Sequence, residues 1–489
     1  MIKKLIFTVK KSEWSLFGLM FLIVSLININ FNVLRSARNA LVVASEGGSA
    51  AFIPYFELFG TFPASILLTW GISRLMRVFS FRSIFSLTMI FFLSFFIIFP
   101  IWILPHREVI HTLLEKPFGL FFDFSRLKAA LNHWPDLIFY IMAELWKVAL
   151  LSVLFWGFIN QRLSLEMAKR FYPPLMLGSS IGAILAGPIT VFCTSERCWK
   201  LFSLSPERWQ HSLYFLTFYL VLFGLATLFA FNALYKKLKI QEVSFEEEAK
   251  EKTPFKLRLL SLSSSFQYLL KSPYLLSLLF IVIAEYVSYA LGELIFLETL
   301  KERFPAPEDF CGYLGRLTLW TGILTAFCAV ILTPFLLQKF RWSYSAMLTP
   351  VLMVLMTFAF FTAIYLGKIN VFGSSPLPFI VFLGSLHFCI GRSIKYTVFD
   401  TTKELAFIPL SQEAQVKGKL VIDGIGSRLG RGTSSLLSIT LFLLVGGPGE
   451  SAIFAGIIAT SFALLSLPAA RSISREFEKT QTQESIADV

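Results

Sequence analysis

The residues of this chain with the clearest potential for chemistry are ionisable side chains that stand inside long apolar stretches. They come in pairs along the sequence: Arg35 and Arg38, Glu144 and Lys147, Glu285 and Glu293, and Arg392 and Lys395. An ionisable group in the core of a membrane is costly unless it faces a cavity or a partner, so such groups mark functional sites. The sequence therefore predicts polar sites inside a membrane-embedded fold.

Some of these groups also have simpler interpretations. Glu144 and Lys147 lie three residues apart on one helix face and could neutralise each other. Glu285 and Glu293 are eight residues apart, which places them within about a quarter turn of each other on a helix, and one structural partner does not explain both. His387 is expected to be packed, or to cap a helix, rather than to carry protons.

A basic stretch, "KYTVFDTTKELAFIPLSQEAQVKGK", begins at the last of these charges. Its cations and those that follow it are Lys395, Lys403, Lys417, Lys419, Arg428 and Arg431. One interpretation is an inner loop that binds lipid headgroups, worth about 1 kcal/mol per charge. The segment "VKGKLVIDGIGSRLGRG" favours another, because glycines let backbone amides approach a ligand closely and flanking cations suit phosphate. The stretch therefore predicts a phosphate-binding path.

Membrane helices must hold these charges. The chain has 489 residues, of which 55% are hydrophobic and 15% charged. Soluble domains carry about 25% charged residues, so the composition excludes a water-soluble globular protein. A membrane-spanning helix needs roughly 20 apolar residues. The pattern predicts an all-α polytopic membrane protein with about twelve transmembrane helices, at 15–35, 50–73, 83–105, 135–159, 172–193, 211–234, 273–299, 313–337, 343–366, 376–394, 431–447 and 450–470.

The distribution of Lys and Arg between the loops predicts the orientation. The inner loops carry more of these residues than the outer loops when both termini are placed in the cytoplasm. A charged segment separates six spans from six, so we expect an N-terminal half (1–234), a cytoplasmic linker (235–272) and a C-terminal half (273–489). Two six-helix halves are typical of many secondary transporters.

Several chemistries are excluded or not expected. "GSRLGRGTS" lacks the spacing of a phosphate-binding loop, and no soluble nucleotide-hydrolysing domain fits, which excludes a primary pump. No convergent His, Cys or Asp group indicates an enzyme, and the five cysteines fit no metal spacing, so neither metal nor cofactor is expected. Cys193 and Cys198 flank a short loop and could pair on an oxidising side, but two unpaired cysteines are expected.

Four segments carry a resemblance to a known family: "YIMAELWKVALLSVLFWGFINQ", "AKRFYPPLMLGSS", "KYTVFDTTKELAFIPL" and "VKGKLVIDGIGSRLG". They resemble the ATP/ADP translocase family, the nucleotide transporters of plastids and obligate intracellular bacteria, which is unrelated to the mitochondrial carriers. The similarity runs from Arg38 to the last spans. It implies a major-facilitator-like fold and exchange or proton-coupled import of nucleotides.

The resemblance also implies roles for particular residues. Glu144 stands in the family's "AELW" motif, Glu293 matches a glutamate of its seventh span, and Lys417 and Lys419 stand in its "KGK" motif. Arg38 takes the place of a lysine in a "KDTLV"-like motif. With the basic stretch, the expected substrate-binding set is Arg38, Glu144, Glu293, Lys395, Lys403, Lys417, Lys419 and Arg428.

The chain departs from the family pattern at several positions. Asn39 replaces an aspartate, Thr401 replaces a proline, and Leu297 stands where a lysine usually follows the glutamate of the seventh span. An arginine is also not interchangeable with a lysine. These changes bear on whether the chain carries out strict ATP/ADP exchange.

Three functions therefore stay open. The first is exchange of ATP for ADP, and the second is nucleoside triphosphate/proton symport with Glu293 as the proton carrier, since a carboxyl group in a low-dielectric site tends to be protonated. The third is a membrane-embedded enzyme acting on a phosphorylated substrate. The expected partners are a nucleotide (ATP, ADP or another nucleoside triphosphate) and the lipid bilayer of a bacterial inner membrane, with no nucleic acid, and the chain is expected to be a monomer.

Overall fold

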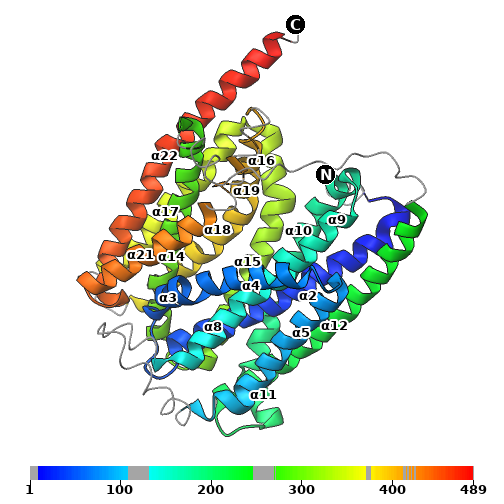
Figure 1. Cartoon of the computed structure of the whole chain (residues 1–489). Coiled ribbons are helices and arrows are strands. Elements are labelled where there is room, and N and C mark those ends of the chain that lie inside the picture. Colours follow the sequence, from blue (N-terminus) through cyan, green and yellow to red (C-terminus); the bar gives the residue numbers. More distant parts are fainter. Residues whose placement is uncertain are drawn as a thin grey trace. The chain divides into compact units, whose positions relative to one another are not determined.

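The structure is a computed structural model that describes residues 9–107, 132–245, 269, 271–369, 376–410, 415, 418–419, 421–422 and 426–487 (Figure 1). All regular structure in these residues is helical. The long helices are α2 (Trp14–Asn39), α4 (Phe62–Leu75), α5 (Phe81–Ile98), α8 (Trp134–Lys147), α10 (Leu165–Cys193), α12 (Arg208–Phe245), α14 (Pro273–Arg303), α15 (Pro307–Phe327), α17 (Trp342–Lys368), α18 (Leu377–Ile394), α21 (Ser427–Leu444) and α22 (Pro448–Ala487).

Short segments complete the helical structure. The short α-helices are α3 (Phe52–Tyr55), α9 (Trp156–Arg162), α11 (Glu196–Phe202), α16 (Thr333–Lys339) and α19 (Asp400–Leu405). A 3₁₀ turn, η1 (Lys11–Glu13), precedes α2. Wider, π-helical turns continue several helices: η2 (Ala40–Ala44), η3 (Phe56–Thr61), η4 (Phe99–Ile103), η5 (Val148–Phe155), η6 (Cys328–Leu332) and η7 (Lys395–Phe399).

The predicted membrane helices are present, with one difference. Among the described residues, 11 helical stretches are long and apolar enough to cross a membrane. They coincide with the predicted spans except for the span predicted at 431–447. A helix, α21, does form there, but Arg428, Arg431 and several serines lower its hydropathy below that of a typical span. The prediction of an all-α polytopic membrane protein is confirmed.

The chain divides by its contacts into two compact units. Unit 1 is Met1–Lys252 with Phe304–Ile323, and unit 2 is Thr253–Arg303 with Leu324–Val489. The first part of α15, which we expected in the C-terminal half, therefore groups with unit 1. Helix α12 continues to Phe245, so the predicted linker begins as helix, and residues 246–268 lie outside the described part of the chain.

Unit 1 is organised around α2, which is buried along most of its length. Figure 1 shows α2 running beside α8 and α12, and it also packs against α10. Polar groups fix these contacts: Asn30 Nδ2 donates to the Leu220 carbonyl (3.0 Å), and Trp146 Nε1 donates to the Ile27 carbonyl (3.1 Å). A side-chain donor facing a backbone oxygen is satisfied without water, as a lipid-embedded bundle requires.

The first part of α15 crosses α10 at close range, which explains its place in unit 1. A Cβ atom added at Gly187 would lie 2.6 Å from Leu319 Cβ, and one added at Gly315 would lie 2.9 Å from Thr190 Cβ. Both distances are too short for real side chains. The two glycines therefore permit the close backbone approach that membrane helices use in place of hydrophobic association.

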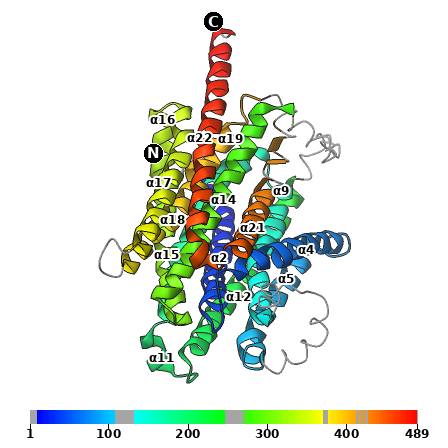
Figure 2. The ribbon, with the colours of Figure 1, turned by 90° about the vertical axis from the view of Figure 1, so that its left-hand side faces the viewer.

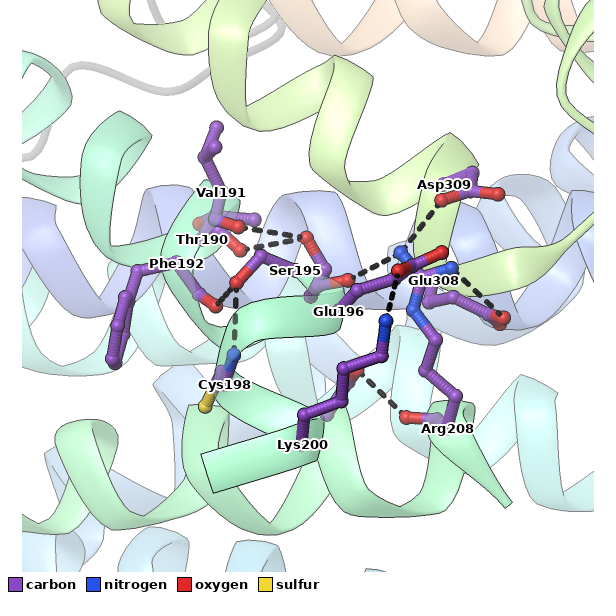
Figure 3. Close-up of polar contacts among 12 residues, drawn as sticks. Thr190, Val191, Phe192, Ser195, Glu196, Cys198, Lys200, Arg208, Glu308 and Asp309 are labelled. Atoms are coloured by element: carbon purple, nitrogen blue, oxygen red, sulfur yellow. Dashed lines mark hydrogen bonds and ion pairs between the residues drawn. The ribbon is translucent and has the colours of Figure 1, made fainter. Parts of the chain in front are cut away.

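Arg208 ties the ends of three helices of unit 1 together (Figure 3). Its guanidinium donates to the Thr194 carbonyl after α10 and to Asp309 Oδ1 at the start of α15, both at 2.8 Å. Glu308 lies 3.9 Å from the same group. Cys193 and Cys198, which lie near this end of α10, are both buried with free thiols in the structure, and their pairing stays a prediction.

Unit 2 is organised around α14 in the same way. Figure 2 shows α22 running alongside α14 and α17, and the contacts between these helices are extensive. Ser288 Oγ on α14 donates to the Ala459 carbonyl of α22 (2.7 Å), and the Trp342 ring stacks on that of Phe477 with 4.2 Å between centroids. These contacts anchor α22 to both neighbours.

We expect Arg208→Ala to destabilise the protein, because three helix ends lose their common cation. A hydrogen bond to a charged group contributes about 1.5–3 kcal/mol, so the thermal unfolding midpoint of the detergent-solubilised protein should fall by several degrees. The matched control is Lys200→Ala, whose ion pair with Glu196 is exposed and lies within one helix. Such pairs are worth about 0–1 kcal/mol. Equal shifts in both variants would contradict the anchoring role of Arg208.

Candidate functional site

In unit 1, the structure brings together two of the predicted site residues, Arg38 and Glu144. Arg38 is in the last turn of α2 and only 5% exposed, and its Nη1 forms an ion pair with Glu144 Oε1 on α8. The guanidinium also lies over the Tyr140 ring, 4.3 Å from its centroid. Tyr140 in turn donates its hydroxyl to Glu57 Oε1 (3.2 Å). A chain of charge and hydrogen bonds thus joins α2, α8 and η3.

Arg38 keeps binding capacity beyond this ion pair. A guanidinium carries five N–H groups, and Arg38 Nε is buried without a hydrogen-bond acceptor among the described residues. Planar oxyanions such as carboxylate and phosphate suit the remaining donors. Lys147 does not neutralise Glu144 in this arrangement, since its ammonium lies over the Phe31 ring, 4.8 Å from the centroid.

In unit 2, Lys395 is the buried cation. It is 6% exposed, and its Nζ lies 3.1 Å from Glu285 Oε2 on α14. The same ammonium lies 3.3 Å from the centroid of the Tyr286 ring and 5.8 Å from that of Tyr289. An ammonium over an aromatic face is stabilised most where water is excluded. Lys395 is therefore held by one carboxylate and two rings.

Three charges of these helices lie close to the points where regular α-helix changes to the wider π-helical turn. Arg38 precedes η2, Lys147 precedes η5, and Lys395 is the first residue of η7. Such turns are rare and frequently lie at functional sites. The position of the charges at these turns supports a functional interpretation for each.

Glu293 lies two helical turns beyond Glu285 on α14. Glu293 is half-buried on α14, and the preceding residue, Gly292, faces His387, because an added Cβ would lie 2.3 Å from that ring. His387 is fully buried, and its Nε2 lies 3.3 Å from the Thr357 hydroxyl. The prediction that His387 is a packed residue is confirmed. The role of Glu293 stays a prediction.

The cations of the basic stretch are less buried than Lys395. Lys403 lies 3.6 Å from Asp400, and Lys419 forms an ion pair with Glu404. Arg428 is exposed on α21, and Lys417 lies outside the described residues. Their assignment to substrate stays a prediction.

A family model described as TLC ATP/ADP transporter matches residues 1–477. The chain belongs to the TLC ATP/ADP transporter family. It is 30% identical over 471 residues to "ADP,ATP carrier protein 1" of Chlamydia trachomatis, covering 94% of this chain and 88% of that protein. It is 29% identical over 479 residues to "ADP,ATP carrier protein 2, chloroplastic" of Arabidopsis thaliana, covering 96% and 75%.

Solved structures show which fold this TLC protein shares. A bacterial homologue of the iron transporter ferroportin, in an inward-facing state, superposes with a TM-score of 0.59 at 15% identity, covering 94% of this chain and 98% of that one. A D-xylose–proton symporter gives 0.56 at 13% identity, covering 93% and 97%. The major-facilitator-like fold and the family resemblance stated from the sequence are both confirmed.

Sequence reasoning did not find every residue that holds these TLC site charges. Tyr140 was missed, although it stands four residues before Glu144 and hence on the same helix face. Glu285 was noted as a charge in an apolar stretch but was not placed in the site. Its partner Lys395 is far away in sequence, so no local spacing connects the two.

A double substitution separates binding from stability at Arg38. We expect Arg38→Gln or Glu144→Gln alone to destabilise the protein, because each leaves an uncompensated buried charge, which costs about 3–5 kcal/mol. The double variant should regain stability in detergent but not nucleotide transport in liposomes. Lys147→Gln is the matched control, since Lys147 belongs to the same turn of α8 but not to the ion pair. Recovery of transport in the double variant would show that Arg38 has only a structural role.

Proposed function

We propose that the protein is a secondary transporter that exchanges ATP for ADP, or related nucleoside triphosphates for diphosphates, across a membrane. The observation that carries this proposal is membership of the TLC ATP/ADP transporter family over residues 1–477. The buried cations support it, because the charged phosphates of a nucleotide cannot leave water without fixed counter-charges.

We assign the phosphate contacts first to Arg38 and Lys395. The guanidinium of Arg38 offers a planar fork that matches two phosphate oxygens, whereas the Lys395 ammonium acts as a compact charge. Glu144 orients Arg38 by pairing with it. The other members of the proposed binding set are Glu293, Lys403, Lys417, Lys419 and Arg428.

The setting of the protein belongs to the same proposal. Both termini lie in the cytoplasm, as the distribution of Lys and Arg indicates, and the membrane is a bacterial inner membrane. The protein acts as a monomer and is not an enzyme. An enzyme acting on a phosphorylated substrate has no support among the relatives, which are named as carriers.

A second candidate function is nucleoside triphosphate/proton symport. The half-buried Glu293 favours it, because the residue one helical turn further along α14 is the buried, apolar Leu297. A carboxyl group on such a face can alternate between its charged and neutral forms during a transport cycle.

Uptake into liposomes distinguishes the two functions. For an exchanger, labelled ATP should accumulate only in liposomes preloaded with ADP, and an uncoupler should have no effect. For a symporter, ATP should accumulate in empty liposomes under an inward proton gradient, and the uncoupler should abolish accumulation. Absence of uptake under both conditions would refute the assignment of nucleotide as substrate.

A second experiment tests the basic stretch. Lys419→Gln should reduce triphosphate transport roughly tenfold or more, since a charge-assisted contact to phosphate is lost. Lys236→Gln is the matched control, because Lys236 is exposed on the predicted linker side of α12. It should leave transport unchanged. If both variants transport at the parent rate, Lys419 does not lie on the phosphate path.

A further inference from the structure

Four residues of unit 2 form a continuous series from the surface to the interior. Arg431 on α21 is exposed, and its guanidinium carbon lies 5.9 Å from the centroid of the half-buried Tyr286 ring. The buried Lys395 contacts the same ring at 3.3 Å and ends the series at Glu285. Lys395 is thus close to a cation that solvent reaches, while its carboxylate partner lies deeper.

Glu285 has two different environments. It contacts the Lys395 ammonium, the only cationic group within ion-pair distance of Glu285 in the described part of the chain. It also lines a small cavity, with room for about one water molecule. The polar groups that line it besides Glu285 are Ser288, Thr349 and Ser466.

The hydroxyl groups of this cavity suit a protonated carboxyl. Ser288 donates its hydrogen to the Ala459 carbonyl (2.7 Å), and Ser466 donates its hydrogen to the Ala463 carbonyl (2.6 Å). Their oxygens can therefore only accept from the cavity. Thr349 Oγ1 is buried and has no hydrogen-bond partner among the described residues, so it can accept or donate. Two of the three hydroxyl oxygens are therefore acceptors only. A carboxylate needs donors, whereas a neutral carboxylic acid offers one.

We infer that Glu285 is a displaceable, proton-accepting counter-ion of Lys395. In the empty protein the carboxylate neutralises the ammonium. When a phosphate oxygen of bound nucleotide takes the ammonium, Glu285 accepts one proton from solvent and becomes a neutral acid that donates toward the cavity. When the nucleotide leaves, the proton returns to solvent and the ion pair forms again. This inference rests on the proposed function.

Burial explains why a proton must replace the lost cation. The Glu285 side chain is only 4% exposed, so an unpaired carboxylate would be strongly destabilised there. The more distant charges do not replace Lys395, because Asp400 and Lys403 have opposite signs and pair with each other. The other polar side chains around Lys395 are the phenols Tyr286 and Tyr289, whose rings lie 3.3 and 5.8 Å from its ammonium.

The inference gives a definite proton count for transport. A loaded protein carries one more proton than an empty one, so exchange of one nucleotide for another moves no net proton. If instead the empty protein returns, each nucleotide is delivered together with one proton. Exchange and proton-coupled import then differ in one respect only: whether the binding site carries a nucleotide when it returns to the other side of the membrane.

The test is proton uptake on binding, measured on the purified full-length protein in a weakly buffered solution with a pH indicator. The measurement is made above about pH 7.5, where a phosphate group is fully ionised. Adding ATP or ADP should remove about one proton from solution per nucleotide bound, with binding measured separately. Because binding takes up a proton, affinity should fall up to tenfold per pH unit in this range.

Variants assign the proton. Glu285→Gln should still bind nucleotide, without proton uptake and without this pH dependence. The matched control is Glu302→Gln, an exposed glutamate of the same helix, which should keep both. Ser466→Ala removes from the cavity an oxygen that can only accept, so it should reduce the proton uptake without loss of folding. It keeps the assignment testable if Glu285→Gln does not fold.

Two results would overturn the inference. One is nucleotide binding by the parent protein without proton uptake, which would leave the proposed function intact. The other is unchanged proton uptake in Glu285→Gln. Absence of any nucleotide binding would instead overturn the proposed function, and this inference with it.

Discussion

A charge buried in a lipid-embedded helix bundle is stabilised by a counter-charge on a neighbouring element, and each unit of this protein holds such a pair. In unit 1 Arg38 on α2 pairs with Glu144 on α8, and in unit 2 Lys395 in η7 pairs with Glu285 on α14. In each case a tyrosine ring lies under the cation. Because breaking such a pair leaves an uncompensated charge, these contacts fix how the helices of each unit meet.

The fold alone does not choose the cargo. Proteins of similar fold are described as an iron-transporter homologue and a sugar–proton symporter, at no more than 15% identity to this chain. Function is determined by the residues that a shared fold presents. An anionic cargo suits this protein because its buried cations offer more hydrogen-bond donors than their carboxylate partners use. The clearest case is Arg38 Nε, which has no acceptor among the described residues.

Hydropathy was sufficient for most of the fold. Span after span appears where about 20 apolar residues predict it, and the error at 431–447 has a simple cause, since α21 begins with arginines, glycines and serines. The site could be predicted only in part. Local spacing suggested that Glu144 pairs with Lys147, but the ion-pair partner of Glu144 is Arg38, 106 residues away in the sequence. Such pairs depend on how helices cross, which a single sequence does not encode in any local pattern.

The π-helical turn that begins at Lys395 has a mechanical consequence. A π turn contains one residue more than an α turn, and the rest of the helix accommodates this extra residue without breaking. Moving that extra residue along the helix exchanges a few backbone hydrogen bonds at a time. It also rotates every side chain that it passes by about 100°. A side chain at the edge of η7 can therefore change the direction in which it points while the helices on either side keep their packing.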